Sequence, residues 1–122
     1  MKTALVTGAS GFCGSHLASR LRRDAIRVIG LDVWEERPFW SSDEDYYRVN
    51  IGDFDALFQT IQSVRPDYIF DLAGIGNGPF QDVYGTNAIG TINLLEAVHG
   101  SGIDARILLV GSAAEYGQVG LS

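Results

Sequence analysis

Cysteine and lysine are nearly absent from this sequence of 122 residues, which contains one of each, Cys13 and Lys2. A single cysteine excludes an internal disulfide and a cysteine-rich metal site, and we expect no metal centre. The sequence has no apolar run long enough to span a bilayer, and its N-terminus shows no signal-peptide pattern. We therefore expect no membrane partner and a cytoplasmic location.

Basic side chains as a whole are scarce. Nine Lys and Arg residues stand against fifteen Asp and Glu residues, which gives a formal net charge of −6. Because binding to a nucleic-acid backbone depends on clustered basic side chains, we expect no nucleic-acid partner. A bound anion would instead be held by backbone amides. The length predicts a single domain over residues 1–122.

Glycine, in contrast, is plentiful, and three glycines are regularly spaced in the stretch 7–14, Thr-Gly-Ala-Ser-Gly-Phe-Cys-Gly. The stretch follows an apolar run and precedes a helical pattern, which predicts a strand, a turn and a helix start. There Gly8 would permit a tight bend, Gly11 would leave room for a diphosphate, and Gly14 would let the helix approach the sheet. The free N–H groups of the helix N-terminus would favour the anion. Taken alone, the spacing also fits an ordinary strand-to-helix turn.

Asp32 gives the glycine stretch a more specific meaning. An amphipathic helix is predicted over residues 15–23 and a short strand over 26–31, and Asp32 ends that strand 18 residues after Gly14. A carboxylate at this point can accept hydrogen bonds from the adenosine ribose hydroxyls of a dinucleotide. It would repel a 2′-phosphate, so NAD is favoured over NADP. A solvated Asp at a strand end would explain the residue but not its spacing from the glycines.

The next segment is predicted to form a loop, a strand and a helix. Residues 33–45 lack a steady period, and we expect Trp34 and Trp40 of this loop to pack over the sheet edge. The alternative is that they cover the adenine or a partner surface. A strand over 46–50 and a helix over 54–64 follow. Asp53 can cap this helix or bind the adenine amine, and one carboxylate can do only one of these.

The last third of the sequence adds two strands and a long helix. Residues 66–74 predict a strand that runs into a small-residue loop, 81–100 a helix, and 106–110 a fifth strand. The apolar positions of the helix cover more than one narrow stripe, so it either faces a partner subunit in a homodimer or is buried on two sides by its own domain. Apolar strands alternating with helices predict an α/β fold of the Rossmann type, a doubly wound parallel sheet with helices on both faces and strand order 3-2-1-4-5.

With these elements placed, the chain resembles the N-terminal half of an extended short-chain dehydrogenase/reductase, the NAD-dependent epimerase/dehydratase family of nucleotide-sugar enzymes. The matching motifs occur in the family's order and are Thr7-Gly8-x-x-Gly11-x-x-Gly14, Asp32, Asp53, Asp71-Leu72-Ala73-Gly74, Thr86-Asn87-Ala88-Ile89-Gly90-Thr91 and Gly111-Ser112-Ala113-Ala114-Glu115-Tyr116-Gly117. The segment 106–117 is similar to that of GDP-4-keto-6-deoxy-D-mannose reductases.

The resemblance implies a role for individual residues. Phe12 and Cys13 would offer backbone amides to the diphosphate, and Asp53 and Phe54 would lie at the adenine. The nicotinamide end of NAD would be lined by Leu72, Ala73, Gly74, Ile75 and Thr86. Ser112 matches the family's catalytic Ser or Thr, which hydrogen-bonds the sugar oxygen undergoing oxidation or reduction.

Three departures from the family pattern narrow the expected activity. Asp71 stands where the family often has His or Asn. Ala113 and Ala114 follow Ser112 where 4,6-dehydratases carry an acid and a base, which disfavours a dehydratase because methyl groups transfer no protons. The family's Tyr-x-x-x-Lys motif is absent from the 122 residues, and Tyr116 does not replace it, since residue 120 is Gly.

Two functions follow as expectations. The first is the NAD-binding part of a nucleotide-sugar reductase or epimerase, truncated before the C-terminal substrate region and with little or no turnover by itself. The alternative is a stand-alone NAD-binding regulatory or interaction module without catalysis.

Overall fold

The computed structural model describes residues 1–34, 40, 45–73 and 85–109, and these form a parallel sheet with helices on both faces. The elements in chain order are β1 (Thr3–Thr7), α1 (Phe12–Arg23), β2 (Arg27–Asp32), β3 (Tyr46–Arg48), α2 (Phe54–Val64), β4 (Tyr68–Asp71), the π-helix η2 (Gly85–Ile89), α4 (Gly90–Ser101) and β5 (Arg106–Leu109). The strand order is β3-β2-β1-β4-β5, and every neighbouring pair is parallel. The predicted Rossmann-type fold and strand order are confirmed.

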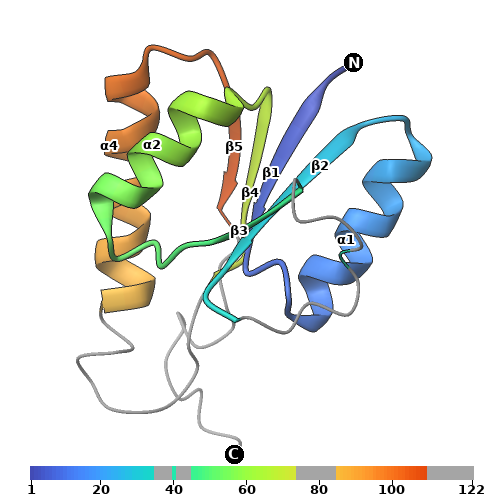
Figure 1. Cartoon of the computed structure of the whole chain (residues 1–122), viewed down its shortest axis with the longest axis horizontal. Helices are drawn as coiled ribbons and strands as arrows, with labels where there is room; N and C mark the ends of the chain where they lie inside the picture. The colour runs from blue at the N-terminus through green and yellow to red at the C-terminus, as the bar shows by residue number, and fades with distance from the viewer. Residues whose placement is uncertain (35–39, 41–44, 74–84, 110–122) are drawn as a thin grey trace, which may run out of the picture.

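Two apolar clusters hold the helices against the sheet. Successive residues of a strand point to opposite faces, and β1 shows this directly. Leu5 belongs to the cluster under α2 and α4, whereas Ala4 and Val6 belong to the cluster under α1. Figure 1 shows α1 on one side of the sheet and α2 with α4 on the other. Because both faces are covered there, the middle residues of β1 (Ala4–Val6) and β2 (Val28–Leu31) are buried and carry no charge, as expected inside a parallel sheet.

Several helices and strands begin or end at other residues than the sequence predicts. The first helix begins at Phe12 rather than Ser15, and the third strand ends at Arg48 rather than Asn50. The long helix is described from residue 85 and opens with the π-helix, while 81–84 lie outside the described residues. The helix over 54–64 is confirmed at both ends: Asp53 caps its start, and Arg65 ends it in a left-handed conformation with φ 48°.

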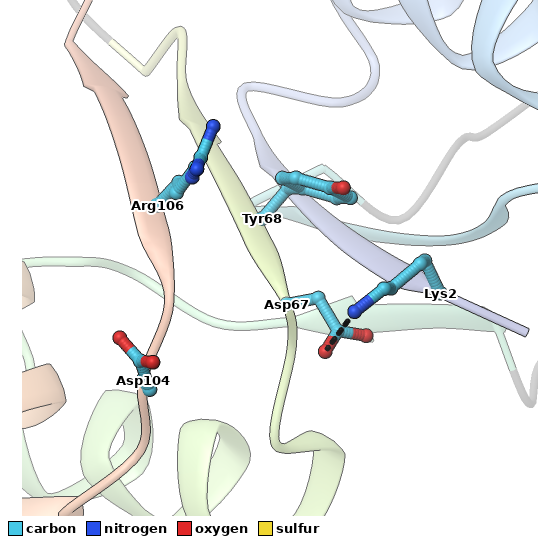
Figure 2. A pocket seen from close by; sticks show the side chains of 5 residues that line it. All are labelled: Lys2, Asp67, Tyr68, Asp104 and Arg106. Atoms are coloured by element: carbon cyan, nitrogen blue, oxygen red, sulfur yellow. Dashed lines mark ion pairs between the residues drawn. The ribbon is translucent and has the colours of Figure 1, made fainter.

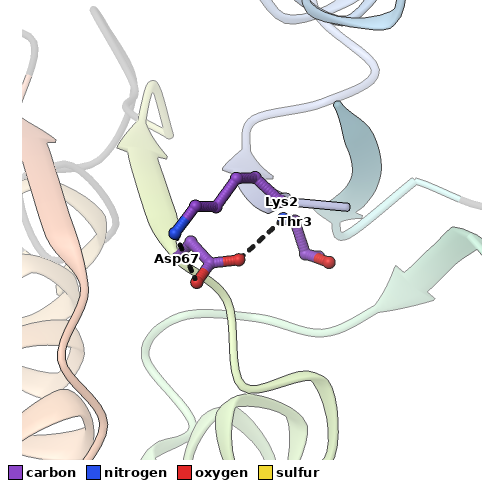
Figure 3. Close-up of polar contacts among 3 residues, drawn as sticks. All are labelled: Lys2, Thr3 and Asp67. Atoms are coloured by element: carbon purple, nitrogen blue, oxygen red, sulfur yellow. Dashed lines mark hydrogen bonds and ion pairs between the residues drawn. The ribbon is translucent and has the colours of Figure 1, made fainter. Parts of the chain in front are cut away.

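The amino ends of the strands carry a cluster of charged side chains. Asp67 Oδ2 accepts a hydrogen bond from the Thr3 backbone N–H at 2.9 Å, and Lys2 Nζ lies 3.9 Å from Asp67 Oδ1 (Figure 3). A cavity of about 290 Å³ opens beside them, lined by Lys2, Asp67, Tyr68, Asp104 and Arg106 (Figure 2). This cavity lies at the end of the sheet opposite to the glycine turn, so it is separate from the predicted dinucleotide site.

In the part of the chain that the structure describes, no helix is both long enough and apolar enough to cross a membrane. The same residues contain no group of three or more His, Cys, Asp or Glu side chains arranged to hold a metal ion.

Candidate functional site

The glycine turn lies where β1 ends, and its first glycine is required by the fold. Gly8 has φ 69°, a left-handed conformation that favours glycine. A Cβ atom there would lie 2.9 Å from the carbonyl carbon and oxygen of Leu72. The turn closes with a hydrogen bond of 3.1 Å from the Gly11 N–H to the Gly8 carbonyl oxygen. Gly8 therefore serves both the bend and the close approach of the loop that follows β4.

Gly11 and Gly14 differ in what surrounds them. A Cβ atom on Gly14 would overlap the carbonyl oxygen of Gly8 and lie 2.9 Å from Ala9 Cα, so glycine is needed for α1 to approach the turn. Gly11 is exposed and has φ −76°, and a Cβ atom there would meet only the Gly8 oxygen, at 3.3 Å. The fold thus requires Gly14 more strictly than Gly11.

The N-terminus of α1 is open to an anion. Its N-cap residue, Gly11, has no side chain that could cap it, and its first turn contains no acidic residue. Phe12 and Cys13 are exposed, and the basic residues of the helix lie in its last turn. The helix therefore has no negative side chain of its own at the positive end of its dipole, beside the turn.

Asp32 lies next to the glycine turn, as the sequence predicts. Its Oδ2 accepts a hydrogen bond from the Ser10 N–H at 2.9 Å, and its Oδ1 accepts one from the Val33 N–H at 2.7 Å. Ser10 also lies within hydrogen-bond distance of the Tyr46 hydroxyl, at 3.0 Å. The carboxylate that ends β2 is therefore held directly against the glycine turn.

Asp53 and Phe54 begin α2 after the third strand. Asp53 Oδ1 accepts a hydrogen bond from the Ala56 N–H at 3.3 Å. Of the two roles predicted for Asp53, the structure therefore shows the cap of α2. Phe54 is 38% exposed, and its ring stacks on Phe58 with centroids 5.8 Å apart. An apolar ring face thus remains accessible at this end of the sheet.

The two tryptophans of the predicted loop have different environments. Trp40 is buried against Gly30 and Ala9, which agrees with the expected packing on the sheet. Trp34 is 65% exposed, so the expectation that it packs over the sheet edge is wrong. Trp34 lies two residues beyond the end of β2 and directly after the exposed Val33, outside the covered part of the sheet.

A buried polar contact joins β1 to β4, and the pattern of the sequence did not predict it. Asp71 Oδ1 accepts a hydrogen bond of 2.6 Å from the Thr7 hydroxyl, and Thr91 Oγ1 lies 3.4 Å from Asp71 Oδ2. Burial raises the pKa of Asp71, although the hydrogen bonds from Thr7, Thr91 and the Ala73 backbone oppose that rise. The signal was available, because the predicted strand order makes the last residues of β1 and β4 neighbours.

The structure brings together only part of the predicted site. Leu72 and Ala73 follow β4 and donate their backbone N–H groups to Thr7 Oγ1, each at 3.1 Å. Thr86 lies in η2. Gly74, Ile75 and Ser112 fall outside the described residues.

Comparison with known proteins identifies the chain's relatives. Residues 4–121 match the model of the NAD dependent epimerase/dehydratase family. UDP-glucose 4-epimerase 1 of Oryza sativa subsp. japonica is 30% identical over 96% of the chain and 38% of its own length. The Bordetella bronchiseptica enzyme WbmH, solved in complex with NAD+, has a TM-score of 0.82 and 25% identity over 96% of the chain and 41% of its own. For an Agrobacterium tumefaciens uronate dehydrogenase complexed with NAD, the TM-score is 0.78 and the identity 31%, over 92% of the chain and 41% of its own.

The chain therefore spans about two fifths of the length of these relatives. The family match covers nearly all of it, from the first strand of the sheet onward. The fold, the glycine turn and Asp32 agree with that match. The chain belongs to the NAD dependent epimerase/dehydratase family.

Proposed function

We propose that the chain binds NAD at the carboxyl end of its sheet and forms the cofactor-binding part of a nucleotide-sugar reductase or epimerase. The observation that carries this proposal is the hydrogen bond of 2.9 Å between the Ser10 N–H and Asp32, which holds the carboxylate that we expect to bind the ribose close to the N-terminus of α1. The rice relative named as a UDP-glucose 4-epimerase and the NAD complex of WbmH support it.

The residues of the glycine turn fit a diphosphate. Gly11 has no side chain although its backbone conformation would accept one, which leaves space above the helix N-terminus. In this proposal the diphosphate contacts Gly8, Gly11, Phe12, Cys13 and Gly14. Asp32 binds the adenosine ribose, Phe54 and the start of α2 that Asp53 caps lie at the adenine, and the nicotinamide end lies along Leu72, Ala73, Gly74, Ile75 and Thr86.

Bound NAD would supply a hydride acceptor and donor for a sugar carbon. The chain's own contribution is to bind and orient NAD. The N-terminus of α1 binds the negatively charged diphosphate, and Asp32 accepts hydrogen bonds from the ribose hydroxyls. Ser112 would hydrogen-bond the reacting sugar oxygen. A hydroxyl without a base does little proton transfer at neutral pH, so we expect little turnover from these 122 residues.

Calorimetric titration with NAD and NADP tests the binding. We expect NAD to bind more tightly than NADP, and Gly11→Ala to weaken NAD binding about tenfold, roughly 1.4 kcal/mol, because a methyl group would enter the diphosphate space. The melting temperature of Gly11→Ala should stay near that of the wild type. Unchanged affinity in this variant, or no NAD binding by the wild type, would contradict the proposal.

A turnover assay tests the second part. The purified chain should leave GDP- and UDP-sugars unchanged in the presence of NAD. Turnover that is lost in Ser112→Ala would overturn this expectation. A stable, stoichiometric complex of the chain with a full-length relative would instead favour the stand-alone binding module.

A further inference from the structure

The two tryptophans of the chain differ in what their indole rings contact. The Trp40 ring is 4% exposed, donates its Nε1–H to the Ala9 carbonyl oxygen at 3.2 Å and lies under the Arg22 guanidinium, 4.7 Å away. The Trp34 ring is 65% exposed, and in the part of the chain that the structure describes its N–H makes no hydrogen bond. Trp34 is thus a large, flat side chain whose ring the described residues leave accessible.

The backbone beneath Trp34 is nevertheless fixed. The Val33 N–H donates to Asp32 Oδ1 at 2.7 Å, and Arg48 Nε donates to the Val33 carbonyl oxygen at 3.0 Å. The Tyr46 hydroxyl donates to the Trp34 carbonyl oxygen at 2.6 Å and lies 3.0 Å from Ser10 Oγ. The Tyr46 hydroxyl therefore links the Trp34 backbone to the glycine turn, and these hydrogen bonds hold the backbone that carries the exposed ring.

We infer that Trp34 is a cofactor-binding residue whose indole stacks on the adenine ring of NAD. This inference rests on the proposed function, in which Asp32 holds the adenosine ribose. Trp34 comes two residues after Asp32, which ends β2 and carries the proposed ribose contact. An aromatic face stacks on any base, so the adenine would cover a ring that the described residues leave accessible.

Phe54 provides an apolar surface on the same side of the sheet. It follows the strand next to β2, is 38% exposed, and is held by stacking on Phe58 with an interplanar angle of 17°. The proposed nicotinamide contacts, Leu72 and Ala73, follow β4 on the other side of β1. Trp34 and Phe54 are therefore both placed for the adenine end of the dinucleotide rather than its nicotinamide end.

The experiment compares the affinity of NAD and of AMP, which share the adenosine, for the wild type and two Trp34 variants. Trp34→Ala should weaken both ligands by the same factor, about tenfold, because stacking on one base is lost. Trp34→Tyr keeps an aromatic face and should restore most of the affinity. Ile92→Ala, which trims another exposed apolar side chain on α4, is the control and should bind both ligands like the wild type.

Fluorescence gives a second readout, because Trp34 and Trp40 are the only tryptophans. NAD should quench the wild type and leave the emission of Trp34→Phe, which comes from buried Trp40, nearly unchanged. Equal affinity of Trp34→Ala and the wild type, or a loss for NAD without a loss for AMP, would overturn the inference while leaving NAD binding intact. If the wild type binds neither ligand, the proposed function and the inference both fail.

Discussion

The Thr7 hydroxyl donates a hydrogen bond to the Asp71 carboxylate across neighbouring strands, with 2.6 Å between Oγ1 and Oδ1. The same hydroxyl oxygen accepts from the N–H groups of Leu72 and Ala73. A hydroxyl has one proton and two lone pairs, so all of its hydrogen-bonding capacity is used. The contact fixes the loop after β4 against the end of β1, next to the turn at Gly8.

Removing the acceptor of this contact should destabilise the fold. Asp71→Ala would leave the buried Thr7 hydroxyl proton without a partner, and we expect the free energy of unfolding to fall by about 1–3 kcal/mol. Asp71→Asn keeps an oxygen that can accept from Thr7 and is the matched control, with a smaller loss. Urea denaturation measures both. Equal losses in the two variants would show that the hydrogen bond is not what Asp71 contributes.

The stability contributed by Asp71 should depend on pH. Burial raises its pKa above the ordinary value of 3.8 in the folded state, so the folded protein holds this proton more tightly than the unfolded chain. The contribution is fully present below the ordinary pKa and is lost as pH rises through the folded pKa. The free energy of unfolding of the wild type, minus that of Asp71→Asn, should therefore fall as pH rises from about 3 towards neutrality. A difference that rises over this range would contradict the raised pKa.

The sequence predicted most of the fold because its signals are local. The glycine spacing, the apolar strands and Asp53 before an amphipathic helix each depend on neighbouring residues, and each is found in the structure. Asp32 was predicted beside the glycine turn because parallel strands end at the same edge of a sheet, and its hydrogen bond to Ser10 agrees.

The features that were missed depend on contacts between distant residues. The exposure of Trp34 and the burial of Trp40 cannot be separated by composition, since both lie in one aperiodic loop. What separates them is that Gly30 leaves space for the Trp40 ring on β2. The Thr7–Asp71 bond spans 64 residues and becomes predictable only after the strand order is known.

The exposed side of α4 provides a test of the homodimer. Leu94, Ala97 and Val98 of α4 are buried, whereas Ile92 and Leu95 of α4 are 55% and 44% exposed, and Ile89 at the end of η2 is 41% exposed. An apolar stripe of this kind is typical of a protein interface. We expect light scattering to show a dimer whose fraction rises with protein concentration. Ile92→Glu would place a charge in the interface and should raise the dissociation constant of the dimer at least about tenfold.

The control for the dimer is Gln62→Glu, which adds the same charge on an exposed position of α2. It should leave the dissociation constant unchanged. A wild-type protein that stays monomeric at the highest concentration reached would contradict a homodimer through this stripe.

The choice between NAD and NADP should depend on the charge of Asp32. Its carboxylate would repel the 2′-phosphate of NADP, and Asp32→Asn removes that charge while keeping one acceptor oxygen for the ribose or the Ser10 N–H. We expect the ratio of NADP to NAD affinity to rise about tenfold, roughly 1.4 kcal/mol. The ratio is the informative quantity, because general damage to the glycine turn would weaken the binding of both dinucleotides equally.

The control is Ser10→Ala, which keeps the backbone N–H and loses only the contact with the Tyr46 hydroxyl. It should leave the ratio of NADP to NAD affinity unchanged. A ratio that does not change in Asp32→Asn would show that discrimination against the 2′-phosphate resides elsewhere in the chain.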